Sequence, residues 1–413
     1  MLTRGRYDKP LVMLAPDSAR PSERAMLTLA LLSSLAFLVS IDSRMVAPLL
    51  PAIATSVRAS VGATGLIVTA YAIPYGLFQI AYGPLADRFG KVAVVRVAVL
   101  LFGAGTLGCG LTGDLFSLTV LRIVTGAFAA CVFPMTLAYI GDVFPMSQRQ
   151  TAIGNLVTIT SVATVMSPAI GGIFASVLSW RALFIVCGAA TFLPAIWLFR
   201  IPQSRGRALG SYGLRALVAP FGSVLRSRAA LTIDGLVFAE GALTAGLTYL
   251  GAFLYDDFHL DYTRIGLLLG LYGVGSVVTA RNIGRIARRI GSPTLVGGGA
   301  VLLALSYLVL LGPHSQVLFA AAMLAMGSGF VLCHSTLQTR ITEAVPEKRA
   351  TAVALFAFSL FLGGGAGTAV LSVILTTAGY QAVISVCGVG LLLFAVGGAI
   401  AMRQLRFGRL PSA

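Results

Sequence analysis

Residues 83–91 of this chain read Gly83-Pro84-Leu85-Ala86-Asp87-Arg88-Phe89-Gly90-Lys91, a short charged turn between two long apolar stretches. A partial copy follows in the second half of the chain, Gly284-Arg285-Ile286-Ala287-Arg288-Arg289-Ile290-Gly291. The copy keeps the glycines and the basic residues, but it has Arg288 in place of the acid. A charged turn that is used once in each half of a chain predicts a protein built from two related halves.

Further pairs of residues repeat with nearly the same spacing. Thr136-Leu137 recurs as Thr336-Leu337, Gly126 recurs as Gly327, and Val186-Cys187-Gly188 recurs as Val386-Cys387-Gly388. One such pair could arise by chance, but a shared spacing across separate segments indicates an internal duplication.

The composition predicts that most of the chain lies in lipid. Of the 413 residues, 57% are hydrophobic and only 11% are charged, and the mean hydropathy is +0.91. A water-soluble protein of this length could not bury so much apolar surface. Twelve apolar segments are long enough to span a bilayer: 26–50, 61–83, 92–112, 115–141, 151–178, 181–200, 229–255, 264–283, 292–312, 315–340, 350–377 and 380–402. We therefore expect an all-α membrane protein.

The distribution of charge predicts the topology. The formal net charge is +16, and most Lys and Arg residues fall in the tails, the linker and alternate loops. Because cytoplasmic loops are enriched in basic residues, both termini are expected in the cytoplasm of a multi-pass inner (plasma) membrane protein. The same distribution argues against a nucleic-acid partner. The expected organisation is a tail (1–25), an N-terminal six-helix half (26–200), a linker (201–228), a C-terminal six-helix half (229–403) and a second tail (404–413).

The turn at 83–91 resembles the signature G-x-L-x-D-R-x-G-[RK] of the major facilitator superfamily, and the likeness is greatest to its twelve-span drug:proton antiporters. The resemblance implies twelve transmembrane helices in two pseudo-symmetric halves around a central cavity. It also implies that Gly83, Asp87, Arg88, Gly90 and Lys91, with Asp142 as a partner, close the cytoplasmic side. The alternative is that this turn only anchors the topology.

Four ionisable residues inside the apolar segments are candidates for proton coupling. A charge within a membrane is costly unless it faces a polar cavity or a partner, so such residues are usually functional. Arg122 belongs to an R-x-x-x-G string that resembles a family motif linked to proton coupling. Asp42 lies at a similar depth, and we expect both to face the cavity, with a static ion pair as the alternative. Glu240 is expected to be the more easily protonated acid. His334 is either a cavity residue or a packing residue, and Arg44, two residues after Asp42, is expected to extend outward.

Polar residues at helical spacing are candidates for the substrate cavity. Tyr71, Tyr75 and Gln79 form a stripe on the second span, and Gln338 shares a helix face with His334. Such stripes also serve helix packing.

Residues 163–172 resemble the antiporter motif G-x-x-x-G-P-x-x-G-G, with Pro168, Gly171 and Gly172 retained and both leading glycines replaced. No nucleotide-binding loop, metal-ligand set or nucleophile–base pair stands out, so neither an enzyme nor a cofactor or metal is expected. The leading expectation is a monomeric secondary transporter that exports a small lipophilic or cationic compound in exchange for protons. The alternatives are a transporter of a metabolite such as a sugar or an organic acid, and a membrane sensor or embedded enzyme.

Overall fold

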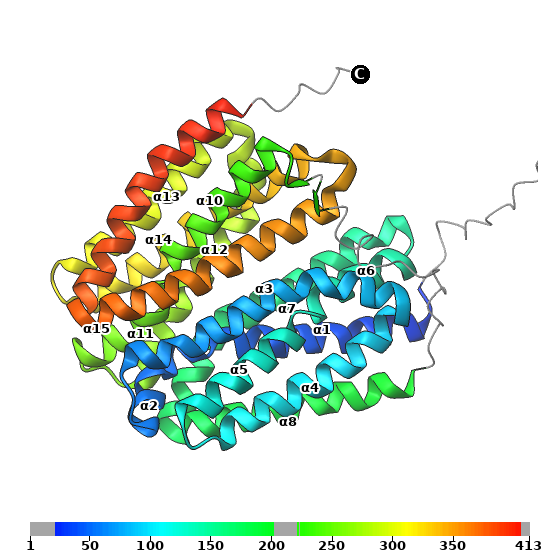
Figure 1. Ribbon diagram of the computed structural model, residues 1–413, viewed down its shortest axis with the longest axis horizontal. Helices are drawn as coiled ribbons and strands as arrows, with labels where there is room; N and C mark the ends of the chain where they lie inside the picture. The colour runs from blue at the N-terminus through cyan, green and yellow to red at the C-terminus, as the bar shows by residue number, and fades with distance from the viewer. Residues whose placement is uncertain (1–20, 202–220, 223, 406–413) are drawn as a thin grey trace, which may run out of the picture.

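The computed structural model describes residues 21–201, 221–222 and 224–405, and the side chain of Asp87 lies outside the described part. Most of both predicted tails and most of the predicted linker also lie outside it. The described residues are nearly all helical (Figure 1). The helices of the N-terminal half are α1 (Glu23–Arg44), α2 (Val46–Val57), α3 (Val61–Phe89), α4 (Lys91–Leu111), α5 (Leu115–Ala129), α6 (Val132–Val143), α7 (Met146–Val177) and α8 (Trp180–Arg200). Those of the C-terminal half are α10 (Arg228–Thr244), α11 (Leu247–Asp256), α12 (Tyr262–Arg289), α13 (Ser292–Leu308), α14 (Gln316–Ala344) and α15 (Arg349–Gln404).

Short polar residues begin many of these helices. A side-chain oxygen of the residue before the helix accepts a hydrogen bond from a backbone N–H of the first turn, which would otherwise lack a partner. These N-terminal caps are Ser22, Ser60, Asp114, Ser179, Ser227, Asp261 and Ser315. The caps fix where the chain turns back into the bundle.

The described helices form twelve membrane-crossing spans, as the sequence predicted. Eleven apolar segments are long enough to cross a membrane, and the longest of them contains α15. Within α15, Gly379 has φ 80° and ψ −178°, a conformation that breaks the helix and that glycine adopts at low cost. The break divides α15 into two spans, 349–378 and 380–404.

Three of the spans are interrupted near their middle. Span one is divided at Met45 into α1 and α2, span four at Ala130 and Cys131 into α5 and α6, and span seven at Ala245 and Gly246 into α10 and α11. An interruption leaves non-helical backbone at mid-membrane depth. Such backbone is tolerated where it is buried in protein or lines a cavity.

The contacts of equivalent glycines confirm the internal duplication. A Cβ atom added to Gly126 would lie 2.3 Å from the carbonyl oxygen of Tyr71, and one added to Gly327 would lie 1.9 Å from that of Tyr272. Tyr71 and Tyr272 are themselves separated by the repeat spacing. Spans two and four of one half therefore cross as closely as spans eight and ten of the other.

The two halves are joined at one end of the molecule and separate at the other. One cluster of buried apolar residues contains side chains from both halves, including Met45, Ile53, Tyr249 and Phe253. Two further clusters belong each to one half, around Phe102 and around Phe356. Figure 1 shows the halves diverging from the end that carries α2 and α11 toward the end where α1 begins and α15 ends. We call the first the joined end and the second the termini end.

Backbone contact between small residues closes the joined end. A Cβ atom on Gly172 of α7 would lie 2.0 Å from the carbonyl oxygen of Tyr262, and one on Gly266 of α12 would lie 2.3 Å from that of Pro168. The hydroxyl groups of Ser176 and Thr263 are hydrogen-bonded at 2.7 Å across the same crossing. Only residues without a large side chain permit this approach of the two halves.

On the transport function that the resemblance implies, we expect Gly172→Leu to lower flux about tenfold, because overpacking a close contact costs about 1–3 kcal/mol and here opposes closure of the joined end. Gly154→Leu on the same helix is the matched control, since a Cβ atom there meets no neighbour within 4 Å. The measurement is flux through purified protein in liposomes at equal protein density. Equal loss in both variants would show a general effect of bulk on α7 rather than an effect on closure.

Candidate functional site

A central cavity of about 250 Å³ lies between the two halves. Its wall is formed mainly where spans one and seven are interrupted and where α3, α7, α12, α14 and α15 face inward. The lining residues include Ser43, Arg44, Val46, Ala47, Val68, Ala72, Thr164, Pro168, Gly241, Thr244, Thr248, Leu269, Tyr272, Phe330, Leu360, Phe361 and Thr368. The wall is thus largely apolar and aromatic, with scattered hydroxyl groups, as small-molecule sites commonly are.

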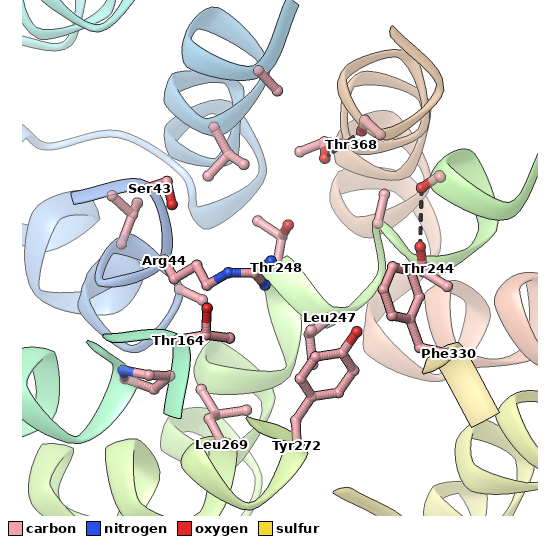
Figure 2. A pocket seen from close by; sticks show the side chains of 18 of the residues that line it. Ser43, Arg44, Thr164, Thr244, Leu247, Thr248, Leu269, Tyr272, Phe330 and Thr368 are labelled. Atoms are coloured by element: carbon pink, nitrogen blue, oxygen red, sulfur yellow. Dashed lines mark hydrogen bonds between the residues drawn. The ribbon is translucent and has the colours of Figure 1, made fainter. Parts of the chain in front are cut away.

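Arg44 extends into this cavity, which corrects the expectation that it points outward. Figure 2 shows its side chain leaving α1 and passing between Thr164 and Thr248. Arg44 is the only charged residue among the described residues that line the cavity.

Glu240 and His334 form a pair behind the cavity wall. The Glu240 carboxylate and Nδ1 of His334 are 3.0 Å apart, and the two side chains are 0% and 16% exposed. The ring of Phe330 stacks on the imidazole with centroids 4.9 Å apart and an angle of 9° between the planes. Because Phe330 and Gly241 both line the cavity, the pair is separated from it by a single layer of protein.

Asp42 and Arg122 form a second pair, inside the N-terminal half. Nη1 of Arg122 donates to a carboxylate oxygen of Asp42 at 2.8 Å, and the side chains are 1% and 0% exposed. The guanidinium also lies over the ring of Tyr71, 4.2 Å from its centroid. The structure thus has the ion pair that the sequence analysis gave as the alternative. The expectation that both face the cavity is wrong for this conformation, because α1 directs Asp42 toward α5 and away from the cavity.

The two buried pairs join equivalent helices. Asp42 and Arg122 connect spans one and four, while Glu240 and His334 connect spans seven and ten. The duplication relates span one to span seven and span four to span ten. The residues themselves are not at equivalent positions, so the two pairs are not copies of one another.

The four residues predicted to contact substrate lie outside the described cavity lining. Tyr71 is buried under Arg122, and Val68 and Ala72 represent α3 in the wall instead. Tyr75 stacks on Tyr71 and its ring lies 4.6 Å from that of Phe361 in the other half. Gln79 and Gln338 lie further toward the termini end on α3 and α14, partly and well exposed. Contact of Tyr71 with the cavity is therefore a wrong prediction in this conformation, and Tyr75 packs at the cavity boundary.

The antiporter-like segment connects the cavity with the joined end. Pro168 lines the cavity together with Thr164, and the hydroxyl of Ser167 donates to the carbonyl oxygen of Ile41 at 2.7 Å. A Cβ atom on Gly171 would lie 2.8 Å from the carbonyl oxygen of Met45. The segment thus packs against the interruption of span one, where Arg44 leaves the helix.

The last residue of the turn at 83–91, Lys91, forms an ion pair that holds α4 to α6. Lys91 is paired with Asp142, and its ammonium group also donates to the carbonyl oxygen of Ala138 at 3.3 Å. Gly90 adopts a positive φ of 88°, whereas a Cβ atom on Gly83 would meet no neighbour within 4 Å, so no close helix contact requires a glycine at position 83. Arg88 is exposed and lies over the ring of Phe89.

The second half has a different version of this contact. Arg340 is ion-paired with Glu343 and donates to the hydroxyl of Ser292, which is the repeat equivalent of Lys91. Glu343, the equivalent of Asp142, thus has its cation on its own helix. The C-terminal turn has Arg288 in place of the acid, and the ion pair near this turn is formed within α14 instead.

Several cavity residues carried no signal that the sequence analysis used. Thr164, Thr248, Tyr272 and Phe330 are ordinary residues of membrane helices, and only their common orientation makes them a site. Tyr272 could have been found, because the repeat spacing relates it to Tyr71.

The model of the Major Facilitator Superfamily matches this chain at residues 32–368 and 252–406. The uncharacterised MFS-type transporter YceJ of Bacillus subtilis is 24% identical, with 82% of this chain and 86% of the relative aligned. A chloramphenicol resistance protein of Pseudomonas aeruginosa is also 24% identical, over 84% of each chain. The fold is similar to that of a bacterial homologue of the human lysosomal transporter Spinster, crystallised inward-facing and unoccupied, with a TM-score of 0.72, 18% identity, and 93% and 96% of the two chains covered. An all-helical, duplicated twelve-span bundle and a family match along nearly its whole length agree, and the chain belongs to the Major Facilitator Superfamily of membrane transporters.

Proposed function

We propose that this protein is a secondary transporter of the plasma membrane that exports a small, largely apolar compound in exchange for protons. The observation that carries the proposal is the Glu240–His334 pair, held 3.0 Å apart directly behind the wall of a cavity between the two halves. An ionisable carboxylate at mid-membrane depth that is paired with a histidine is characteristic of proton pathways.

The separation of the halves at the termini end supports alternating access. If the termini are cytoplasmic, the joined end faces outward and the conformation is inward-facing. Export then requires the joined end to open and the termini end to close around the same cavity. The α7–α12 crossing at Gly172 and Gly266 is the contact that must separate, and the turn containing Lys91 is the part that would close the other side.

Proton binding at the pair can be communicated to the cavity. Gly241 follows Glu240 on α10, and Phe330 covers His334 on α14, so both helices present lining residues beside the pair. A change of charge at Glu240 alters the attraction between these two helices. It therefore alters the affinity of the cavity for its ligand, because both helices form part of the cavity wall. A ligand and a proton that bind with different affinities in two conformations are thermodynamically coupled.

Two observations support export of an apolar compound. The relative from Pseudomonas aeruginosa is named a chloramphenicol resistance protein, and residues 163–172 retain the core of an antiporter-like motif. A second candidate is proton-coupled transport of a metabolite, and the Arg44 side chain in the cavity favours an organic acid over a sugar.

The test uses purified protein in liposomes that contain a pH-sensitive dye, with an acidic interior. A panel of toxic compounds, chloramphenicol included, is first ranked by the tolerance that the protein gives a host without its own pumps. Compounds that gain tolerance are then added to the liposomes, where we expect each to cause proton release from the vesicle interior. Tolerance without any substrate-induced proton movement would contradict proton exchange, and no change in tolerance or flux for any compound would contradict export.

The orientation has its own test. Reporters fused at the C-terminus or within residues 205–225 are expected to be cytoplasmic, whereas one fused after Asp257 is expected to be extracytoplasmic. Asp256 ends α11 at the joined end, and Asp257 and Asp261 follow it before α12, on the far side from the basic α12–α13 turn. A cytoplasmic signal at Asp257 would reverse the proposed direction of the cavity.

A further inference from the structure

Arg44 differs from the other arginines that are enclosed by the helix bundle. Arg122 is paired with Asp42, Arg96 donates to backbone carbonyl groups at the end of α8, and Arg181 donates to Ser56 and Thr112. Arg44 makes no hydrogen bond or ion pair with any described residue and is well exposed within the cavity. A guanidinium held at mid-membrane depth without a protein partner is costly, which points to a partner supplied from outside the protein.

The acids near Arg44 are already committed to other groups. Asp42 is fully buried with Arg122 on the opposite side of α1, and Glu240 is fully buried with His334 behind Phe330. The described cavity lining contains no carboxylate. The cavity therefore presents an uncompensated positive charge, which repels a cationic ligand and attracts an anionic one.

The surroundings of Arg44 suit a carboxylate. The planar guanidinium offers parallel N–H groups that match the two oxygens of a carboxylate. Figure 2 shows the hydroxyl groups of Thr164 and Thr248 on either side of the guanidinium, where they can donate further hydrogen bonds.

The rest of the cavity wall suits an apolar body. Phe330, Phe361 and Leu269 line the cavity, together with the ring of Tyr272. The rings of Tyr272 and Phe330 lie 6.2 Å apart at an angle of 47°, so they present an aromatic surface across the cavity from Arg44.

We propose that the central cavity binds a small amphipathic organic anion whose carboxylate pairs with Arg44 and whose apolar body lies against Phe330 and Phe361. This inference rests on the proposed function, because it takes the cavity as the substrate site, and it narrows the largely apolar compound to one that carries a carboxylate. An anion is also suited to export, since the interior-negative membrane potential drives negative charge outward.

The test compares three forms of one skeleton: 4-phenylbutyrate, its neutral amide, and the cationic 4-phenylbutylamine. Two further skeletons, benzoate and 1-naphthylacetate with the corresponding amides and amines, cover different apolar bodies. Binding to the purified full chain is measured by titration calorimetry in detergent. We expect at least one acid to bind about tenfold more tightly than its amide and its amine, the size of a charge-assisted hydrogen-bonding contact.

Variants assign this preference to Arg44. Arg44→Gln is expected to reduce the acid-to-amide ratio to about one while amide binding changes less than about twofold, and Arg44→Lys is expected to retain part of the ratio. Arg264→Gln removes the same charge from an exposed ion pair at the joined end and should leave the ratio unchanged. Melting temperatures of all variants show whether each is folded.

The outcomes separate this inference from the proposed function. A preference for amines, a preference for acids that survives in Arg44→Gln, or failure of every acid to bind would overturn the anion site. If amides but not acids drive proton exchange in liposomes, the proposed function stands and the anion site is wrong. If acids bind through Arg44 but no compound moves protons, the anion site stands and proton exchange is wrong.

Discussion

Replacing Arg122 with glutamine is expected to abolish transport and to destabilise the protein by about 3–5 kcal/mol, since the change leaves a carboxylate without its partner in a water-free interior. Asp42 is 0% exposed, and the 2.8 Å contact with Arg122 is its one ion pair among the described residues. Arg122 also lies over the ring of Tyr71, a contact that glutamine cannot reproduce.

The double change Asp42→Asn with Arg122→Gln is expected to recover most of the lost stability. Two neutral amide side chains can hydrogen-bond to each other, and no charge is left buried. Flux should recover less than folding. The native pair connects spans one and four, and this connection must hold the N-terminal half together as the half moves.

The measurements are membrane abundance, melting of the purified protein, and flux in liposomes for each single variant and the double. Arg264→Gln is the control, because its ion pair with Asp261 is exposed and such pairs contribute about 0–1 kcal/mol. If the free energy of unfolding of the single Arg122 variant lies within about 1 kcal/mol of that of the double variant, the pair does not act as a buried ion pair.

Replacing Glu240 with glutamine is expected to remove proton coupling while leaving the fold intact. Glutamine has nearly the same shape as glutamate and can keep the 3.0 Å contact with His334, but it cannot take up and release a proton. Gradient-driven flux should fall by about 5- to 150-fold, the usual range for coupling between two sites.

Two flux assays in liposomes distinguish coupling from binding. With an imposed pH gradient, the Glu240→Gln variant should show little substrate-induced proton movement. Exchange of labelled for unlabelled substrate without a gradient should continue, because the cavity wall is unchanged. Asp257→Asn, which removes an acid from the joined end, should behave like the native protein. Full coupling in the Glu240 variant would place the proton pathway elsewhere.

Much of the architecture could be predicted because it depends on local or repeated signals. The lengths of the apolar segments predicted twelve spans, and the break of α15 at Gly379 lies between the predicted spans 350–377 and 380–402. The structure differs mainly at the ends of the spans. The repeat spacing predicted the duplication, which appears in the matching contacts of Gly126 with Tyr71 and of Gly327 with Tyr272.

The candidate site was predicted less completely, because helical periodicity gives relative directions but not absolute ones. Glu240 and His334 were each identified from their depth in an apolar span, yet nothing in either span predicts that they meet. Their pairing depends on how α10 and α14 rotate about their own axes, which packing throughout the C-terminal half decides.

Asp42 and Arg44 show most clearly what the sequence alone determined. Two residues turn a helix by about 200°, so the sequence required that these side chains leave span one in opposite directions. Which one enters the cavity was decided by the tertiary structure. Arg122 on span four approaches span one from inside the N-terminal half, and the large cost of an unpaired buried charge directs Asp42 toward it. Arg44 is thereby left facing the other half, and the cavity gains its cation.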